Sequence, residues 1–269
     1  MIEQSQIAVI GAGNMGAALL RGIVSHQRVP AGNITACDID GTALAPLAEL
    51  GMNTTSDPEA AIAGRHVILL AVKPQIAPSL VDRLSPSITS AQLLISIMAG
   101  VTTEAIEARL KGKVAVVRSM PQLLAFAGVA ATAVCPGAHT GPEQLQLARE
   151  LFDQVGTTVV VEEHQMDAVT GLAGSGPAYV YSIIEALVEG GVSVGLPGEV
   201  ATALAAQTVL GAAHTVLETG EKPADLRARV TSPNGTTVAG LQALRDKGLA
   251  DALISAVQAA TARSRELGR

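Results

Sequence analysis

Aromatic residues are almost absent from this chain of 269 residues, which has two Phe, two Tyr and no Trp. Basic residues are also few, 18 against 24 acidic ones, and the net charge is −6. Proteins that bind nucleic acid need cations that neutralise phosphates and aromatic rings on which bases stack. The composition therefore argues against nucleic acid as a partner.

Cysteine is scarce as well: Cys37 and Cys135 lie in apolar surroundings without CxxC spacing. Two buried, reduced thiols are the expected state, which is typical of the cytoplasm. The N-terminal sequence MIEQSQ has an acid where a signal peptide has basic residues, and the apolar runs HVILLAV and LLISIMAGV are shorter than the roughly 18 residues of a membrane span. We expect a soluble cytoplasmic protein without a membrane partner.

Short apolar runs alternate with helical segments through the first half of the chain, which is 48% hydrophobic overall. Strands that alternate with helices indicate a parallel sheet covered on both faces, and hence an α/β fold. Strands are predicted over residues 7–10, 33–40, 66–74, 92–100 and 114–121, and helices after the first strand and over residues 42–52 and 102–110.

The second half is mostly helical after a loop-rich stretch at residues 135–144. Apolar residues at helical spacing predict a helix over residues 177–191, and residues 199–217 are apolar on nearly every face. Such a helix is expected to be buried on several sides, in part against another subunit. We therefore predict an N-terminal domain of residues 1–162 and an all-α dimerisation domain of residues 163–269.

Three glycines follow the first predicted strand in the pattern GxGxxG, at Gly11, Gly13 and Gly16. The first permits a tight turn, the second lets a pyrophosphate approach the backbone, and the third lets helix and strand pack closely. The acid Asp38 ends the second predicted strand, 22 residues after Gly16, where it can accept from a ribose 2′-hydroxyl and would repel a 2′-phosphate. A purely structural turn is the alternative, but this context favours a Rossmann-type dinucleotide-binding domain.

Few side chains in the helical half could act as strong catalytic acids. No lysine lies between Lys113 and Lys222, although ketone reduction commonly uses lysine or histidine at the developing alkoxide. No histidine pair has the spacing of metal ligands, no cysteine cluster occurs, and GxSxG is absent. A cyclic imine carries its own proton, so its reduction needs alignment more than a protein acid.

Hydroxyl groups gather in the sequence VTSPNGTTVAGLQAL, which begins at Val230. Thr231, Ser232, Thr236 and Thr237 flank a Pro-Asn-Gly turn that is predicted to open a helix. The free N–H groups at this helix start could bind a carboxylate. An ordinary helix cap with surplus threonines is the alternative, and local spacing leaves both open.

Six sequences occur in order along the chain: IGAGNMG, AVKPQ, SIMAGV, GLAGSGPAYVY, GLP and VTSPNGTTVAGLQAL. In order and spacing they resemble the pyrroline-5-carboxylate reductases, over essentially the whole chain. The resemblance implies a Rossmann-type domain followed by a helical domain that joins subunits in a homodimer or a larger ring. It also implies an oxidoreductase of proline biosynthesis, which transfers hydride from NADH or NADPH to the cyclic imine carbon of 1-pyrroline-5-carboxylate and yields L-proline.

The resemblance assigns one group of residues to the cofactor. The turn from Ile10 to Met15 would hold the pyrophosphate, Ala71 to Pro74 would line the nicotinamide side, and Met98 to Gly100 would continue that wall. With the third glycine and the acid after the second strand, the implied cofactor residues are Ile10, Gly11, Ala12, Gly13, Asn14, Met15, Gly16, Asp38, Ala71, Val72, Lys73, Pro74, Met98, Ala99 and Gly100.

A second group is assigned to the substrate. By resemblance, the Thr237 hydroxyl would position the ring nitrogen and act as a weak proton relay, and the backbone of Gly235 and Thr236 would bind the carboxylate. No metal ion is expected. The implied substrate residues are Ser175, Gly176, Ser232, Asn234, Gly235, Thr236 and Thr237, of which Thr237 is the catalytic one.

Two departures from the family pattern concern the substrate. Most members follow Met-Pro with Asn-Thr-Pro, whereas this chain has Gln122, Leu123 and Leu124, which would place two leucines beside the nicotinamide. Many bacterial members have Gly-Gly-Thr where this chain has Asn234 before Gly235, and asparagine tolerates the positive φ of a turn glycine. The Asn234 side chain could enter the carboxylate site, and the leucines could change substrate choice.

A third departure concerns the cofactor. NADPH-preferring members often have Asn-Arg-Ser after the second strand, and this chain has Asp38, Ile39 and Asp40. No arginine is present there to meet a 2′-phosphate, and a carboxylate takes its place. We therefore expect a preference for NADH.

Two alternatives to the family activity stay open. One is a reductase of another small cyclic imine carboxylate, and the other is a catalytically silent dinucleotide-binding sensor. A β-hydroxyacid dehydrogenase is disfavoured, because those enzymes rely on a lysine in the first helix of the second domain and GSGPAYVYSIIEAL has none.

Overall fold

The computed structural model describes residues 2–25 and 29–268. Its contacts divide the chain into unit 1, Met1–Gly174 with Ala260–Arg269, and unit 2, Ser175–Ala259. This division falls later than residue 162, because the segment that follows the last strand packs on unit 1. The domain limits expected from the sequence stay a prediction.

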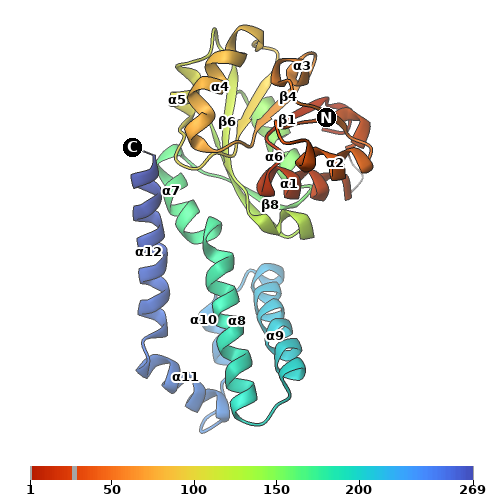
Figure 1. Cartoon of the computed structure of the whole chain (residues 1–269). Coiled ribbons are helices and arrows are strands. Elements are labelled where there is room, and N and C mark those ends of the chain that lie inside the picture. Colours follow the sequence, from red (N-terminus) through yellow and green to blue (C-terminus); the bar gives the residue numbers. More distant parts are fainter. Residues whose placement is uncertain (1, 26–28, 269) are drawn as a thin grey trace. The chain divides into compact units, whose positions relative to one another are not determined.

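Unit 1 is built on one sheet of eight strands in the order β3-β2-β1-β4-β5-β6-β7-β8 (Figure 1). All neighbouring pairs are parallel except β6 and β7, which are antiparallel. The strands are β1 (Ile7–Ile10), β2 (Ile34–Cys37), β3 (Asn53–Thr55), β4 (Val67–Leu70), β5 (Leu93–Ser96), β6 (Ala115–Met120), β7 (Ala130–Pro136) and β8 (Gly156–Val160).

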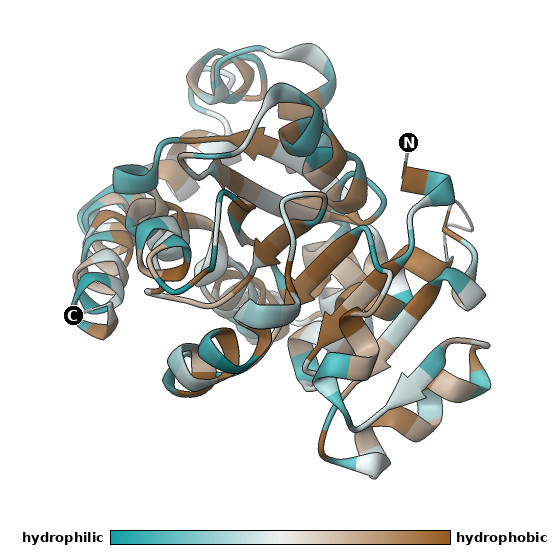
Figure 2. Cartoon of the chain, turned by 90° about the horizontal axis from the view of Figure 1, so that it is seen from above, coloured by the Kyte–Doolittle hydropathy of each residue, from teal (hydrophilic) through white to brown (hydrophobic). Residues whose placement is uncertain are grey.

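Helices cover both faces of this sheet, as the sequence predicts. One face packs on α1 (Asn14–Ser25), α2 (Gly41–Glu49) and α6 (Pro142–Phe152), whose apolar side chains join one buried cluster. The other face packs on α3 (Pro58–Ile62), α4 (Ala77–Leu84) and α5 (Thr103–Glu107) around a second cluster. Strands β1, β2, β4 and β5 are buried along their whole length, and the central strands are brown in Figure 2 because both faces are covered.

The antiparallel strand β7 was not expected from the sequence. The stretch 135–144 is also less loop-rich than expected, because Cys135 and Pro136 end β7 and α6 begins at Pro142. Strand β7 is buried at every position but Ala131 and its last residue, so it lacks the polar and apolar alternation that would have revealed it.

Unit 2 is helical, and its helices bury few residues. Its helices are α8 (Gly176–Ser193), α9 (Gly198–Thr219), α10 (Pro223–Arg229), α11 (Thr236–Asp246) and the first part of α12 (Leu249–Leu267). Helices α8 and α9 meet where a Cβ on Gly191 would lie 3.1 Å from the Ala201 Cβ, and Tyr179 donates from its hydroxyl to the Ala256 carbonyl at 3.3 Å.

The apolar helix α9 is not buried by its own chain. Ala201 and Ala205 are its buried residues, whereas Leu204, Leu210 and Leu217 are exposed. The single chain therefore leaves most of α9 exposed, and the expected burial on several sides depends on another subunit, as the sequence analysis proposes. Its exposed leucines have no partner in the described part of unit 2, and burial would require another surface.

Candidate functional site

The glycine-rich turn joins β1 to α1 at the carboxyl end of the sheet. Gly11 donates its N–H to the Cys37 carbonyl at 2.7 Å, and the Ile10 carbonyl accepts from the Ala71 N–H at 2.8 Å. Gly11 has a φ of +105°, and a Cβ there would lie 2.5 Å from the Ala71 carbonyl oxygen. A Cβ on Gly16 would lie 2.1 Å from the Gly11 carbonyl oxygen. Backbone atoms fill the space at both positions, so both require glycine.

Gly13 needs glycine for a different reason. It is exposed, and a Cβ there would meet no described heavy atom within 4 Å. Folding therefore leaves open space in front of its backbone, beside the helix start at Asn14, which is where a pyrophosphate must approach closely. The turn fits a nicotinamide dinucleotide, which would contact the backbone from Gly11 to Asn14.

Asp38 follows β2 and is held against this turn. Its Oδ2 accepts from the Ala12 N–H at 2.7 Å, and its Oδ1 accepts from the Asp40 N–H at 3.0 Å. Ile39 is 95% exposed, and Asp40 caps α2 by accepting from the Thr42 N–H at 2.9 Å. Asp38 thus fixes the turn and also places negative charge at the end of β2. The sequence predicted only the second of these roles.

The other expected cofactor residues follow β4 and β5. Lys73 is exposed, in the segment between β4 and α4. Met98 is 1% exposed, with its side chain in the core, so only its backbone can line a ligand site. Gly100 has a φ of +75°, and a Cβ there would lie 2.9 Å from the Gly268 Cα, at the end of the chain.

Together these segments form one edge of unit 1. Strands β1, β2, β4 and β5 are parallel neighbours, so the residues that follow each of them meet at their carboxyl ends. Ligands of open α/β sheets bind at this edge, where the strand order reverses. The structure thus brings together the residues that the sequence assigns to the cofactor.

Gln122, which stands where most family members have asparagine, is held by hydrogen bonds to two backbone groups of unit 1. It is 8% exposed; its amide donates to the Ala173 carbonyl and its Oε1 accepts from the Ala131 N–H at 2.9 Å. Leu124 packs against the core, and Leu123 is 51% exposed. Leu123 is thus the more exposed of the two leucines, and the position of both beside the nicotinamide stays a prediction.

The hydroxyl-rich turn of unit 2 precedes α11. The Gly235 N–H donates to the Ser232 carbonyl at 3.0 Å, and Gly235 is the N-terminal cap of α11 without a side-chain cap bond. Asn234 has a φ of +58° and is the non-glycine residue with positive φ in the described chain. Thr236 and Thr237 are exposed in the first turn of the helix. Gly235, and not a threonine, is thus the cap of this helix, and carboxylate binding at the turn stays a prediction.

Ser175 and Gly176 start α8, directly after a π-helical turn over Thr170–Gly174. Both are half-buried, and the Ser175 carbonyl accepts from the Ala178 N–H at 3.1 Å. A π-helical turn inside a helical segment is frequent at functional sites. These residues and the hydroxyl-rich turn both belong to unit 2, whereas the glycine-rich turn belongs to unit 1.

The described residues show neither a metal-binding cluster nor an activated thiol. No group of three or more His, Cys, Asp or Glu side chains in residues 2–25 and 29–268 could hold a metal ion. Both cysteines are free and buried, and burial, reinforced by nearby carboxylates, raises the pKa of Cys37 to about 11 and that of Cys135 to about 12. Neither thiol is activated as a nucleophile.

Comparison with known proteins decides the family. The family described as "Pyrroline-5-carboxylate reductase dimerisation" matches residues 163–267, and the family described as "NADP oxidoreductase coenzyme F420-dependent" matches residues 6–100. A pyrroline-5-carboxylate reductase of Methanosarcina acetivorans is 44% identical over 269 residues, which cover 100% of both chains. The chain belongs to the pyrroline-5-carboxylate reductase family.

Solved structures of reductases in this family agree. The pyrroline-5-carboxylate reductase of Coxiella burnetii has a TM-score of 0.91 and 34% identity, covering 98% of this chain and 99% of that one. The pyrroline carboxylate reductase of Plasmodium falciparum, solved with NADP bound, has a TM-score of 0.88 and 28% identity, covering 99% of each chain. The predicted fold class, the family and the oxidoreductase class are confirmed.

Helix α9 lies inside the region that matches the dimerisation family. By length and composition alone it could cross a membrane, with a mean hydropathy of 1.4, although one such helix is weak evidence. The family match offers a simpler reason for its exposed leucines, namely contact with another subunit. A reductase of this family is therefore expected to form a homo-oligomer.

Proposed function

We propose that this chain reduces 1-pyrroline-5-carboxylate to L-proline with a reduced nicotinamide dinucleotide, in the last step of proline biosynthesis. The observation that carries the proposal is the full-length match to reductases of this name, at 44% identity in Methanosarcina acetivorans. The carboxyl-end geometry supports it independently, because the open backbone at Gly13 and the carboxylate of Asp38 suit a dinucleotide.

The reaction does not require a strong acid from the protein. The nicotinamide, when bound, supplies a hydride, which forms a C–H bond at the imine carbon while the C=N π electrons move to nitrogen. The Thr237 hydroxyl positions the ring nitrogen, which already carries its proton, and the N–H groups of Gly235 and Thr236 bind the carboxylate. Ser175, Gly176, Ser232 and Asn234 complete the proposed substrate residues.

We further propose that NADH is preferred over NADPH. Asp38 and Asp40 place two carboxylates at the end of β2, and neither has a cationic partner among the described contacts. A 2′-phosphate there would be repelled, whereas a 2′-hydroxyl can donate to Asp38. The Plasmodium falciparum relative was solved with NADP, so the preference is a property proposed for this chain's own residues.

A homodimer, or a larger ring built from it, is the proposed assembly. Leu204, Leu210 and Leu217 on α9 expose apolar surface within the region matched by the dimerisation family. Burial of such surface between subunits would stabilise the dimer. The cytoplasm is the proposed compartment, because both cysteines are free thiols.

Steady-state turnover tests the activity. The purified protein is assayed with NADH and with NADPH, using pyrroline-5-carboxylate and the six-membered piperideine-6-carboxylate as substrates. We expect higher kcat/KM on the five-membered ring and higher kcat/KM with NADH. Faster turnover of the six-membered ring would support the alternative imine reductase, and NADH binding without turnover of either would support the silent sensor.

A further inference from the structure

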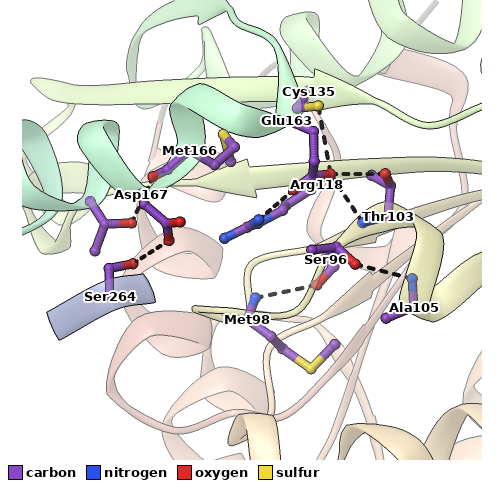
Figure 3. A network of polar contacts seen from close by, with 12 residues as sticks. Ser96, Met98, Thr103, Ala105, Arg118, Cys135, Glu163, Met166, Asp167 and Ser264 are labelled. Carbon is purple, nitrogen blue, oxygen red and sulfur yellow. Dashed lines mark hydrogen bonds and ion pairs between the residues drawn. The ribbon is translucent and has the colours of Figure 1, made fainter. Parts of the chain in front are cut away.

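A carboxylate outside the expected site, that of Glu163, gathers groups from three parts of unit 1 (Figure 3). Its Oε2 accepts from the Thr103 N–H at 3.1 Å and from the Thr103 hydroxyl at 2.8 Å, and the Cys135 thiol lies 3.8 Å away. Its Oε1 forms an ion pair with Arg118 of β6. Glu163 thus ties β6 and the start of α5 to the segment that follows β8.

The buried guanidinium of Arg118 depends on the Glu163 carboxylate for its counter-charge. The Arg118 side chain is 3% exposed, and Glu163 is its only ion-pair partner in the described chain. Its Nε and Nη2 atoms are buried without a hydrogen-bond partner among the described residues. A buried guanidinium that loses its counter-charge is strongly destabilising, so the chain must hold Glu163 in place.

The backbone around Glu163 is correspondingly fixed. The preceding residue, Glu162, and Gln165 form a reciprocal capping box at the start of a short helical turn, with the Glu162 N–H donating to Gln165 Oε1 at 2.9 Å. Farther along, Asp167 accepts from the hydroxyl of Ser264, which is 4% exposed on α12, at 2.7 Å. The carboxylate therefore comes from a well-anchored segment, which suits it to hold another segment in place.

Thr103 connects Glu163 to the edge of unit 1 where the cofactor is proposed to bind, at the carboxyl ends of the parallel strands. It is the first residue of α5, and residues 97–102 join it to the end of β5. This segment includes Met98–Gly100, the expected nicotinamide wall. At its other end, the Met98 N–H donates to the Ser96 hydroxyl at 3.3 Å. The wall is thus held at β5 by Ser96 and at α5 by Glu163.

We propose that Glu163 is a positioning residue for the cofactor: by holding Thr103 and Arg118 together, it fixes residues 97–102 in the conformation that binds the nicotinamide. This inference deepens the proposed function and rests on its assignment of the nicotinamide wall. Loss of the carboxylate weakens dinucleotide binding and leaves the binding of the imine, which unit 2 is proposed to provide, nearly unchanged.

The test uses three variants of the full-length protein. Glu163→Gln keeps the shape but places an amide against Arg118, and Thr103→Val removes the hydroxyl bond but keeps the backbone N–H. Glu162→Gln is the matched control, because it makes the same change one residue away on a side chain that is 78% exposed, and the amide oxygen of glutamine can still accept the capping bond from the Gln165 N–H. Phe152→Leu, at the buried last residue of α6, is the control for lost stability alone.

The readouts are the dissociation constant of NADH, from the fluorescence of the bound nicotinamide, and the KM of each substrate. We expect Glu163→Gln to raise the NADH dissociation constant about tenfold and Thr103→Val to raise it about threefold, with the imine KM within about twofold. Glu162→Gln and Phe152→Leu should bind NADH as the wild type does.

Two results would overturn the inference. In the first, Thr103→Val binds NADH with the wild-type dissociation constant, and Glu163→Gln either does the same or fails to fold. The other is an equal loss of affinity in Phe152→Leu, which would reduce the effect to general stability. Because NADH binding is measured without imine, failure of the proposed reaction would be seen separately, as absent turnover by a wild type that still binds NADH.

Discussion

The Ala12 N–H donates to Oδ2 of Asp38 at 2.7 Å, so the acid at the end of β2 is bonded to the turn that would bind the pyrophosphate. Its other oxygen accepts from the Asp40 N–H at 3.0 Å. Both oxygens keep lone pairs that can accept from ribose hydroxyls. One side chain therefore links the shape of the turn to the recognition of the cofactor's ribose.

Substitution of Asp38 by serine should change cofactor preference and turn geometry together. Removal of the carboxylate eliminates repulsion of a 2′-phosphate and also the bond to Ala12. We expect kcat/KM with NADH to fall about tenfold and the NADH to NADPH ratio to fall by at least as much. Steady-state kinetics with both cofactors measure this, with Asp251→Asn, an exposed acid of α12, as control. An unchanged ratio would contradict the assigned role.

Alanine at Gly16 should affect folding, whereas alanine at Gly13 should affect NADH binding. A Cβ on Gly16 would lie 2.1 Å from the Gly11 carbonyl oxygen, so Gly16→Ala should destabilise the fold by about 1–3 kcal/mol. A Cβ on Gly13 meets no described atom, so Gly13→Ala should unfold at the wild-type Tm and yet bind NADH weakly. Thermal unfolding and NADH titration check both. Wild-type affinity in folded Gly13→Ala would argue against pyrophosphate binding at this turn.

The left-handed residue Asn234 should tolerate glycine and resist alanine. At a φ of +58° a Cβ costs about 1–2 kcal/mol, which the short polar side chain of asparagine partly offsets. Asn234→Ala should lower the Tm of the protein, and Asn234→Gly should retain it. If the Asn234 side chain borders the substrate carboxylate, the glycine variant will also show a changed KM for the imine but not for NADH.

Acid stability should depend on Glu163. Burial raises the pKa of this carboxyl, but its bonds from Thr103 and Arg118 outweigh burial and hold the pKa below the usual 4.5. The unfolded chain therefore binds the proton more readily, and the stability from Glu163 is present above pH 4.5 and lost as the pH falls through the folded-state pKa. The Tm difference between wild type and Glu163→Gln should be largest at neutral pH and shrink in acid. A constant difference would contradict this account.

Much of the cofactor edge could be predicted from the sequence because its signals are local. The glycine spacing directly after β1 and the acid after β2 sit within one βαβ unit, so short-range pattern was enough. The contacts of Gln122 with Ala173 and of Glu163 with Thr103 join residues far apart in the chain. No local spacing reveals which buried amide or carboxylate will meet which backbone, so these roles were missed.

Strand β7 was missed by the sequence analysis, whereas the surface that covers helix α9 lies outside the single chain. Strand β7 runs antiparallel to β6 after the connection over residues 121–129, and its mostly apolar residues resemble any buried segment. Helix α9 is apolar on nearly every face, from which the sequence analysis predicts burial in part against another subunit, and its leucines are exposed in the single chain.

Transfer of a labelled hydride tests the central claim most directly. The protein is incubated with pyrroline-5-carboxylate and NADH that carries two deuterium atoms at the reactive nicotinamide carbon, and the product is examined by NMR and mass spectrometry. Thr237→Ala should slow the transfer about 100-fold, and Thr231→Ala, whose lost hydroxyl donates to the Arg227 carbonyl, should not. The account predicts L-proline with one deuterium on the ring carbon that was double-bonded to nitrogen. Proline without the label, or oxidation of NADH without proline, would contradict it.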